Sequence, residues 1–135
     1  MVKLDWEPLV VAAHAAQKNA YAPYSDFKVG AALITANGDI FGGCNVENAS
    51  YSATVCAERT AIGNALVHGQ NNPIAMVVLT DADHPIAPCG TCRQVLAEFC
   101  DDIPILLIDG EGRRRLTSLS ELLPLQFSGE DFQDA

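Results

Sequence analysis

The spacing of apolar residues along the chain predicts a mixture of helices and strands. Apolar positions recur once per helical turn over residues 6–18, and this period predicts an amphipathic first helix. Two apolar runs, residues 29–35 and 39–45, lie on either side of Asn37-Gly38. Because Asn-Gly is a strong signal for a two-residue hairpin turn, these runs are expected to pair as antiparallel strands.

The middle of the chain alternates helix and strand patterns. Residues 56–67 are rich in helix formers and end shortly before Gly69, so they predict a helix. Residues 76–79 and 105–108 are continuous apolar runs, as in strands buried on both faces, and a further helix is expected over residues 91–99. Successive strand-loop-helix units predict a parallel strand pair joined by a right-handed crossover.

The C-terminal part predicts a hairpin edge and a short helix. Arg113-Arg114-Arg115 is expected to carry solvated charges on this edge, with an anion contact or a subunit interface as the alternative. Residues 118–121 form a capping box that opens the last helix, and Pro124 ends it. The complete pattern predicts an α/β fold, a three-layer α/β/α sandwich on a five-stranded mixed sheet, in one domain spanning residues 1–135.

The composition limits the possible partners. A chain of 135 residues is large enough to bury a core without disulfides. With 49% apolar and only 19% charged residues, it is expected to bury further surface between subunits. Eight basic residues against seventeen acidic ones give a formal charge of −9, which disfavours a nucleic-acid partner, since affinity for the phosphate backbone comes mainly from Lys and Arg.

The sequence favours a cytoplasmic location. The first apolar stretch is short and follows Asp5 and Glu7 instead of a basic segment, so no signal peptide is predicted. No apolar run is long enough to cross a bilayer, and no membrane partner is expected. Five cysteines without an export signal argue against a disulfide framework and for free thiols in a reducing compartment.

Three cysteines and one glutamate form the chemically most specific pattern. Cys56-Ala57-Glu58 opens one predicted helix, and Pro88-Cys89-Gly90-Thr91-Cys92 opens another. Three protein ligands leave a fourth position of zinc for water, which is the arrangement of a catalytic site. The unpaired N–H groups and the positive end of a helix dipole favour thiolates at both helix starts. Glu58 then remains available to move protons.

A glutamate two residues after a zinc ligand, followed by Pro-Cys-x-x-Cys, is the signature of zinc-dependent base deaminases, in which three cysteines are a known ligand set. Around it lie Asn45-Val46-Glu47-Asn48, Arg59, and the stretch 27–32. With these residues the chain resembles the small cytidine deaminases of pyrimidine salvage, from about Tyr24 to the end. The resemblance implies a cytidine deaminase-like fold.

The resemblance also implies the reaction and its cofactor. One zinc ion per subunit would be held by Cys56, Cys89 and Cys92, and Arg59 would hydrogen-bond the ligand sulfurs. The enzyme would be a hydrolase that converts cytidine and 2′-deoxycytidine to uridine and 2′-deoxyuridine with release of ammonia. Glu58 would transfer protons to the ring and to the leaving amine.

Substrate recognition is assigned to a further group of residues. Asn45 and Glu47 alternate along an extended segment, and the resemblance implies that they bind the ribose 3′-hydroxyl. Phe27 would lie beside the base, and Ala57 is also expected at the substrate. The resemblance implies a homotetramer whose sites are shared between subunits, with three residues reaching into a neighbouring pocket: Ala49, Tyr51 and Phe127.

Three alternatives remain open. Cys89-Gly90-Thr91-Cys92 also fits a redox protein, but this leaves Cys56 and Glu58 unexplained. A structural zinc module would need Cys44 or a histidine as a fourth protein ligand. A related deaminase acting on an antibiotic nucleoside such as blasticidin S shares the motif. Arg93 is expected to be a surface residue and His84 to be structural or solvated. Cys44 and Cys100 are expected to be small buried hydrophobic residues.

Overall fold

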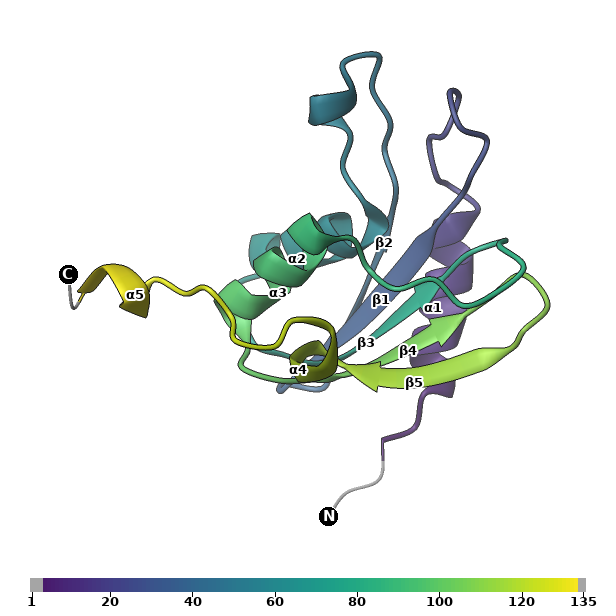
Figure 1. Ribbon diagram of the computed structural model, residues 1–135. Coiled ribbons are helices and arrows are strands. Elements are labelled where there is room, and N and C mark those ends of the chain that lie inside the picture. The colour runs from purple at the N-terminus through teal and green to yellow at the C-terminus, as the bar shows by residue number, and fades with distance from the viewer. Residues whose placement is uncertain (1–3, 134–135) are drawn as a thin grey trace.

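The computed structural model describes residues 4–133 and contains a five-stranded sheet covered by helices (Figure 1). The strand order across the sheet is β2-β1-β3-β4-β5. The strands are β1 (Gly30–Thr35), β2 (Ile40–Cys44), β3 (Pro73–Leu79), β4 (Pro104–Ile108) and β5 (Arg114–Ser118). The helices are α1 (Glu7–Gln17), the 3₁₀ turn η1 (Tyr51–Ala53), α2 (Ala57–Val67), α3 (Gly90–Phe99), α4 (Leu119–Leu122) and α5 (Glu130–Gln133).

Strand pairing confirms the predicted mixed sheet. Strands β1 and β2 are antiparallel across the Asn37-Gly38 turn, where Gly38 has a φ of 88° that favours glycine. Strands β3 and β4 are parallel, and α3 lies on the crossover between them. Strand β3 is longer than predicted, because residues 73–75 also pair with β1.

Both faces of the sheet are largely buried at β3 and β4, which explains the continuous apolar runs of these strands. On one face α1 packs Leu9 and Ala13 against Ala32, Val77 and Ile108. On the other face α2 and α3 cover a second core. The predicted three-layer α/β/α arrangement is therefore confirmed. Among residues 4–133 no helix combines the length and apolarity needed to cross a membrane.

The turn between β4 and β5 holds the segment that follows β3. The carboxylate of Asp109 is buried and accepts a hydrogen bond from Nε of Arg113 at 2.7 Å. Nη2 of Arg113 donates to the carbonyl of Asp83, and the N–H of Gly110 donates to the carbonyl of Ala82 at 2.8 Å. Arg113 is exposed, as expected, and its guanidinium also ties this turn to the segment that follows β3.

Helix α2 lies unusually close to β2 at Gly43. A Cβ atom at Gly43 would lie 2.3 Å from the backbone nitrogen of Ala61 and 2.5 Å from the carbonyl oxygen of Ala57. In addition, the hydroxyl of Thr60 donates to the carbonyl of Cys44 at 2.7 Å. These contacts fix the start of α2, and with it the position of Cys56, relative to the sheet.

We expect Gly43→Ala to destabilise the fold by about 1–3 kcal/mol, because the added methyl group cannot fit without moving α2. Gly63→Ala is the matched control, since a Cβ at this position of the same helix has nothing within 4 Å. It should stabilise the protein by about 0.5–1 kcal/mol through the helix propensity of alanine. Denaturant unfolding measures both, and equal stability of Gly43→Ala and wild type would contradict the close-approach argument.

Candidate metal centre and adjoining cavity

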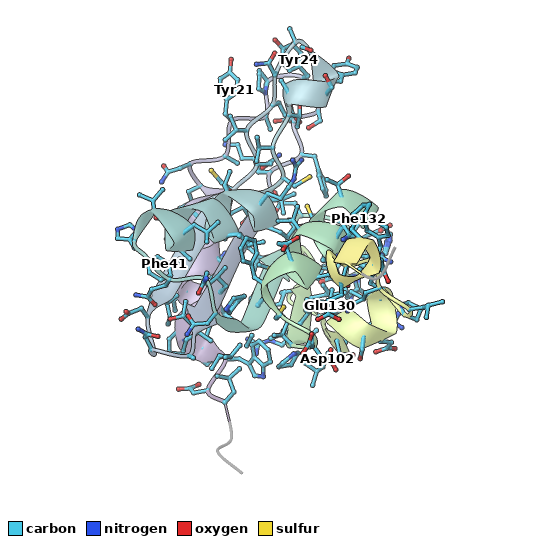
Figure 2. All side chains as sticks on the ribbon, turned by 90° about the vertical axis from the view of Figure 1, so that its left-hand side faces the viewer. Tyr21, Tyr24, Phe41, Asp102, Glu130 and Phe132 are labelled. Atoms are coloured by element: carbon cyan, nitrogen blue, oxygen red, sulfur yellow. The ribbon has the colours of Figure 1, made fainter. Side chains whose placement is uncertain are left out.

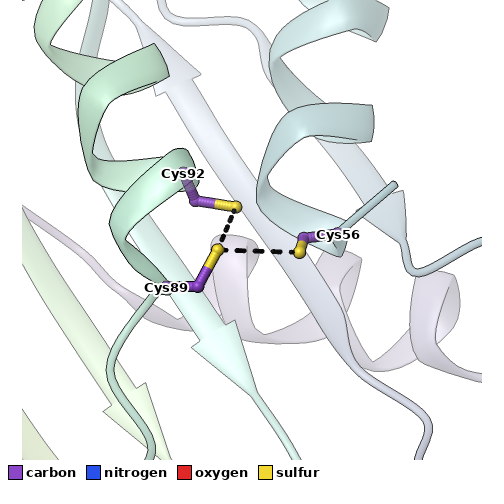
Figure 3. A group of neighbouring side chains, drawn as sticks. All are labelled: Cys56, Cys89 and Cys92. Carbon is purple, nitrogen blue, oxygen red and sulfur yellow. Dashed lines mark hydrogen bonds between the residues drawn. The ribbon is translucent and has the colours of Figure 1, made fainter. Parts of the chain in front are cut away.

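Two helix starts bring the cysteine motifs together. Cys56 is the N-cap residue of α2, and Cys89 is the N-cap residue of α3. Cys92 lies in the first turn of α3, so its side chain points toward the same place (Figure 3). Because both helices present their N-termini here, two positive dipole ends favour negative charge on the sulfurs.

The sulfur separations fit a tetrahedral zinc site. The Sγ atoms of Cys56 and Cys89 are 3.8 Å apart, and those of Cys89 and Cys92 are 3.5 Å apart. Zinc–sulfur bonds of about 2.3 Å in a tetrahedron place neighbouring sulfurs about 3.8 Å apart. All three sulfurs lie within 4.8 Å of one another, and in the described part of the chain no fourth ligand residue joins them. This geometry favours an open site over a closed structural one.

Contacts among the sulfurs shift their pKa values in opposite directions. A hydrogen bond with Cys92 lowers the pKa of the Cys56 thiol well below its ordinary value, against the effect of burial, and Arg59 adds to the lowering. The same hydrogen bond raises the pKa of Cys92, and burial raises it further. The cluster thus already favours one thiolate. A soft divalent cation deprotonates its cysteine ligands outright, so this donor set fits zinc.

Arg59 lies against the sulfur cluster, as the resemblance implied. Its Nη2 donates to the carbonyl of Thr54 at 3.1 Å and contacts Sγ of Cys56 at 3.8 Å. The buried Nε has no hydrogen-bond partner among the residues that the structure describes. Arg59 therefore offers positive charge next to a group of sulfurs that becomes strongly negative when the cysteines ionise.

Glu58 is buried beside the cysteines, with only 5% of its surface exposed. Burial raises the pKa of its carboxyl group, because the charged form loses solvation. Glu58 lines a cavity of about 250 Å³ together with Cys56 and Cys89. A buried carboxyl group on the wall of a cavity, with a raised pKa, is suited to accept and return protons.

Three predicted substrate residues line this same cavity: Phe27, Asn45 and Ala57. Sequence reasoning missed the other lining residues, which are Val29, Thr54, Val78, Thr80, Ile86 and Ala87. The signal that could have found Ile86 and Ala87 is their position directly before the Pro-Cys-x-x-Cys motif. The apolar lining from β3 and this loop gives the cavity walls suited to a flat ring.

Asn45 has a structural contact that sequence reasoning did not foresee. Its Nδ2 donates to the carbonyl of Phe27 at 2.8 Å, and its Oδ1 accepts from the N–H of Val29 at 2.9 Å. The amide therefore holds the backbone on both sides of Lys28. One proton on Nδ2 and one lone pair on Oδ1 remain for a ligand.

Glu47 does not line the cavity of Glu58. It lines a neighbouring cavity of about 200 Å³, where its carboxylate accepts from the N–H groups of Tyr24 at 3.0 Å and Ser25 at 3.1 Å and from the Ser25 hydroxyl. Thr54 lines both cavities, so the two adjoin. Asn45 and Glu47 thus lie on one side of the molecule without sharing a cavity in one chain.

The three residues expected to reach another subunit lie outside the Glu58 cavity of their own chain. Ala49 and Tyr51 are in the projecting loop 45–56, and Tyr51 is 80% exposed. Phe127 is 56% exposed and packs edge-to-face on Phe132 with ring centroids 5.3 Å apart. Figure 2 shows Tyr24 at the tip of the projecting loops, far from Phe132 on the C-terminal segment.

The remaining candidates have ordinary environments, with one exception. Cys44 and Cys100 are partly buried, and burial raises the pKa of both thiols, to about 11 for Cys100. His84 is exposed and pairs with Asp83 at 2.6 Å. The expectation of a solvated Arg93 is wrong, because its side chain is partly buried and hydrogen-bonded to backbone carbonyls.

The chain matches the family model described as "Cytidine and deoxycytidylate deaminase zinc-binding region" over residues 5–106. A cytidine deaminase of Sporosarcina psychrophila is 45% identical over 133 residues, covering 98% of each chain. A cytidine deaminase of Halalkalibacterium halodurans is 44% identical over 132 residues, covering 97% of this chain and 100% of the relative. The crystal structure of cytidine deaminase from Burkholderia pseudomallei is 48% identical, with a TM-score of 0.87 over 92% of this chain and 100% of that one.

We expect each of Cys56→Ala, Cys89→Ala and Cys92→Ala to lose zinc, because three ligands leave no spare one. The matched control is Cys100→Ala, which removes a partly buried thiol at the far end of α3. It should keep one zinc ion per chain. Metal analysis of the purified proteins measures this, and full zinc content in any of the first three variants would contradict the assignment of that cysteine.

Proposed function

The chain belongs to the cytidine and deoxycytidylate deaminase family, and we propose that it hydrolyses cytidine and 2′-deoxycytidine to uridine and 2′-deoxyuridine with release of ammonia. Zinc is its cofactor. The observation that carries the proposal is the buried carboxyl group of Glu58 on the wall of a cavity that also exposes sulfurs of the metal-binding group. A metal and a proton-transfer group next to a ring-sized cavity are the parts that hydrolytic deamination needs.

When bound, zinc would activate a water molecule to act as the nucleophile. Glu58 takes one proton from this water and donates it to ring N3 as the hydroxide adds to C4. It then takes the second proton from the new C4 hydroxyl group and donates it to the amine, which leaves as ammonia while the C4 carbonyl forms. Because burial stabilises the neutral carboxyl group, Glu58 holds the proton readily between these transfers. The walls of the cavity around Glu58 are mainly apolar, so few protein groups compete with the substrate for this proton.

Nucleoside binding divides between the two adjoining cavities. We assign the base to the cavity of Glu58, where Phe27 and Ala57 contact the ring. The sugar then extends past Thr54 toward Glu47, and the free capacity of the Asn45 amide and of the Glu47 carboxylate binds the 3′-hydroxyl. A contact to the 3′-hydroxyl admits both ribose and deoxyribose, which supports activity on both nucleosides.

We further propose that residues 1–135 are one catalytic domain and that it works as a homotetramer in the cytoplasm, where the zinc-binding thiols stay reduced. The support for assembly is the exposure of large apolar side chains at Tyr51 and Phe127. With Ala49, these residues complete the site of a neighbouring subunit, because the cavity of Glu58 lacks a wall from the C-terminal segment in its own chain.

The activity is tested by ultraviolet assay on cytidine, deoxycytidine, cytosine, CMP and blasticidin S. We expect turnover of the two nucleosides and little of the others. Turnover of blasticidin S alone would place the chain with the antibiotic deaminases.

X-ray absorption on the same sample should show three sulfurs and one light atom around zinc. Four sulfurs would indicate a structural zinc site, and absence of metal would indicate a redox protein.

The variant Glu58→Gln should keep its fold, its zinc and its nucleoside binding. Its turnover should fall by about 10²–10⁴-fold, since the amide cannot transfer protons. The matched control is Glu98→Gln, which changes an exposed glutamate of α3 and should leave turnover unchanged. Single-turnover kinetics with metal analysis measures both variants. A retained rate above about a tenth of wild type would exclude the general acid-base role.

Phe127→Ala should raise KM for cytidine, because the ring contributes to a pocket of another subunit. Leu125→Ala, which removes a fully exposed side chain of the same segment, is the control and should keep the wild-type KM. Refolded together with inactive Glu58→Gln chains, Phe127→Ala chains should regain some complete sites. Activity no greater than the sum of the separate preparations, or a monomer by sedimentation, would refute the shared site.

A further inference from the structure

The side chain of Arg93 joins three parts of the chain near the metal-binding group. Its Nε donates to the carbonyl of Pro88 at 2.8 Å, and its Nη1 donates to the carbonyl of Leu122 at 2.8 Å. Leu122 is the last residue of α4, which packs beside α3 (Figure 1). One planar guanidinium therefore connects α3 with the residue before Cys89 and with the end of α4.

The contact with Pro88 bears directly on the orientation of Cys89. Pro88 is fully buried, and the peptide bond that follows it carries the N–H of Cys89. The backbone N–H of Arg93 donates to the carbonyl of Cys89 at 3.0 Å, which is the first hydrogen bond of α3. Arg93 thus binds the carbonyls on both sides of the Cys89 residue. This pair of contacts holds the backbone on both sides of the Cys89 side chain.

The rest of the loop before Cys89 is held only at its far end. Arg113 and Gly110 donate to the carbonyls of Asp83 and Ala82, respectively. Among the described residues, the bond from Arg93 is the hydrogen bond that ties residues 84–88 to another element. Without it, residues 84–88 have no hydrogen bond that holds them against α3, and the Pro88 carbonyl loses its partner in a buried place, which is costly.

We propose that Arg93 is a positioning residue for the metal centre: it orients Cys89 toward the shared zinc site by holding the Pro88–Cys89 peptide against α3 and α4. The proposal rests on the proposed function, because it presumes that Cys89 binds zinc. Arginine suits this position since its donors form a rigid planar fork, which reaches two carbonyls at once. A lysine offers a single flexible ammonium group and cannot reproduce that geometry.

The test compares zinc affinities of the full-length protein, measured by competition with a chromophoric chelator. Groups that orient metal ligands typically contribute about 10–100-fold to metal affinity, so we expect Arg93→Gln to weaken zinc binding by this factor. Arg93→Lys should also weaken it, and this milder variant carries the test if Arg93→Gln does not fold. With excess zinc, kcat and KM of the variants should return to wild-type values, because Arg93 does not line the substrate cavity.

Gln94→Ala is the matched control, because Gln94 is the next residue of α3 and donates to the C-terminal segment at Phe127 without contacting Pro88. It should keep wild-type zinc affinity. Equal weakening in Gln94→Ala, or wild-type affinity in Arg93→Lys, would overturn the proposal. A lowered thermal stability of apo-protein without loss of affinity would also overturn it, as a purely structural role predicts. Absence of zinc and of deaminase activity in the wild type would instead refute the proposed function.

Discussion

The close backbone contact between β2 and α2 is the constraint on which the site depends. At Gly43 the strand and the helix approach so closely that no side chain fits between them. This contact decides where α2 begins, and the N-cap and first turn of α2 supply Cys56, Glu58 and Arg59. Because α3 begins after the loop that follows β3, its N-terminus comes to the same end of the sheet. The N-termini of α2 and α3 therefore lie next to each other through the packing of the two helices on the sheet.

The negative charge of the cysteine thiolates is the main energetic cost at the place where the N-termini of α2 and α3 meet. Three cysteines bring more negative charge than a zinc ion neutralises when all of them ionise. Two helix N-termini and the guanidinium of Arg59 at the Cys56 sulfur offset this negative charge. Glu58 lies close to the same sulfurs but is buried, and burial keeps its carboxyl group easy to protonate. One local environment thus holds both the cysteine cluster and a buried carboxyl group that is readily protonated.

The same end of the sheet carries the loops that shape the cavities. Loops 18–29 and 45–56 project together and are joined by a backbone bridge between Tyr21 and Val46, while a second bridge, between Val46 and Val55, lies within loop 45–56. Asn45 adds to this link by holding the backbone on both sides of Lys28. These contacts place Phe27 in one cavity and Glu47 in the next. In the proposed binding mode, recognition of base and sugar therefore depends on two loops that support each other.

The sequence by itself determined the order of helices and strands, the mixed sheet and the group of three cysteines with Glu58. Hydrophobic period, turn residues and ligand spacing are local properties, so they can be read along the chain. The tertiary structure alone decided that Glu47 lines a separate cavity, that Ile86 and Ala87 line the cavity of Glu58, and that Arg93 binds two backbone carbonyls. These features depend on which distant segments come into contact, and an arginine on a helix has the same local pattern whether its partner is solvent or a buried carbonyl.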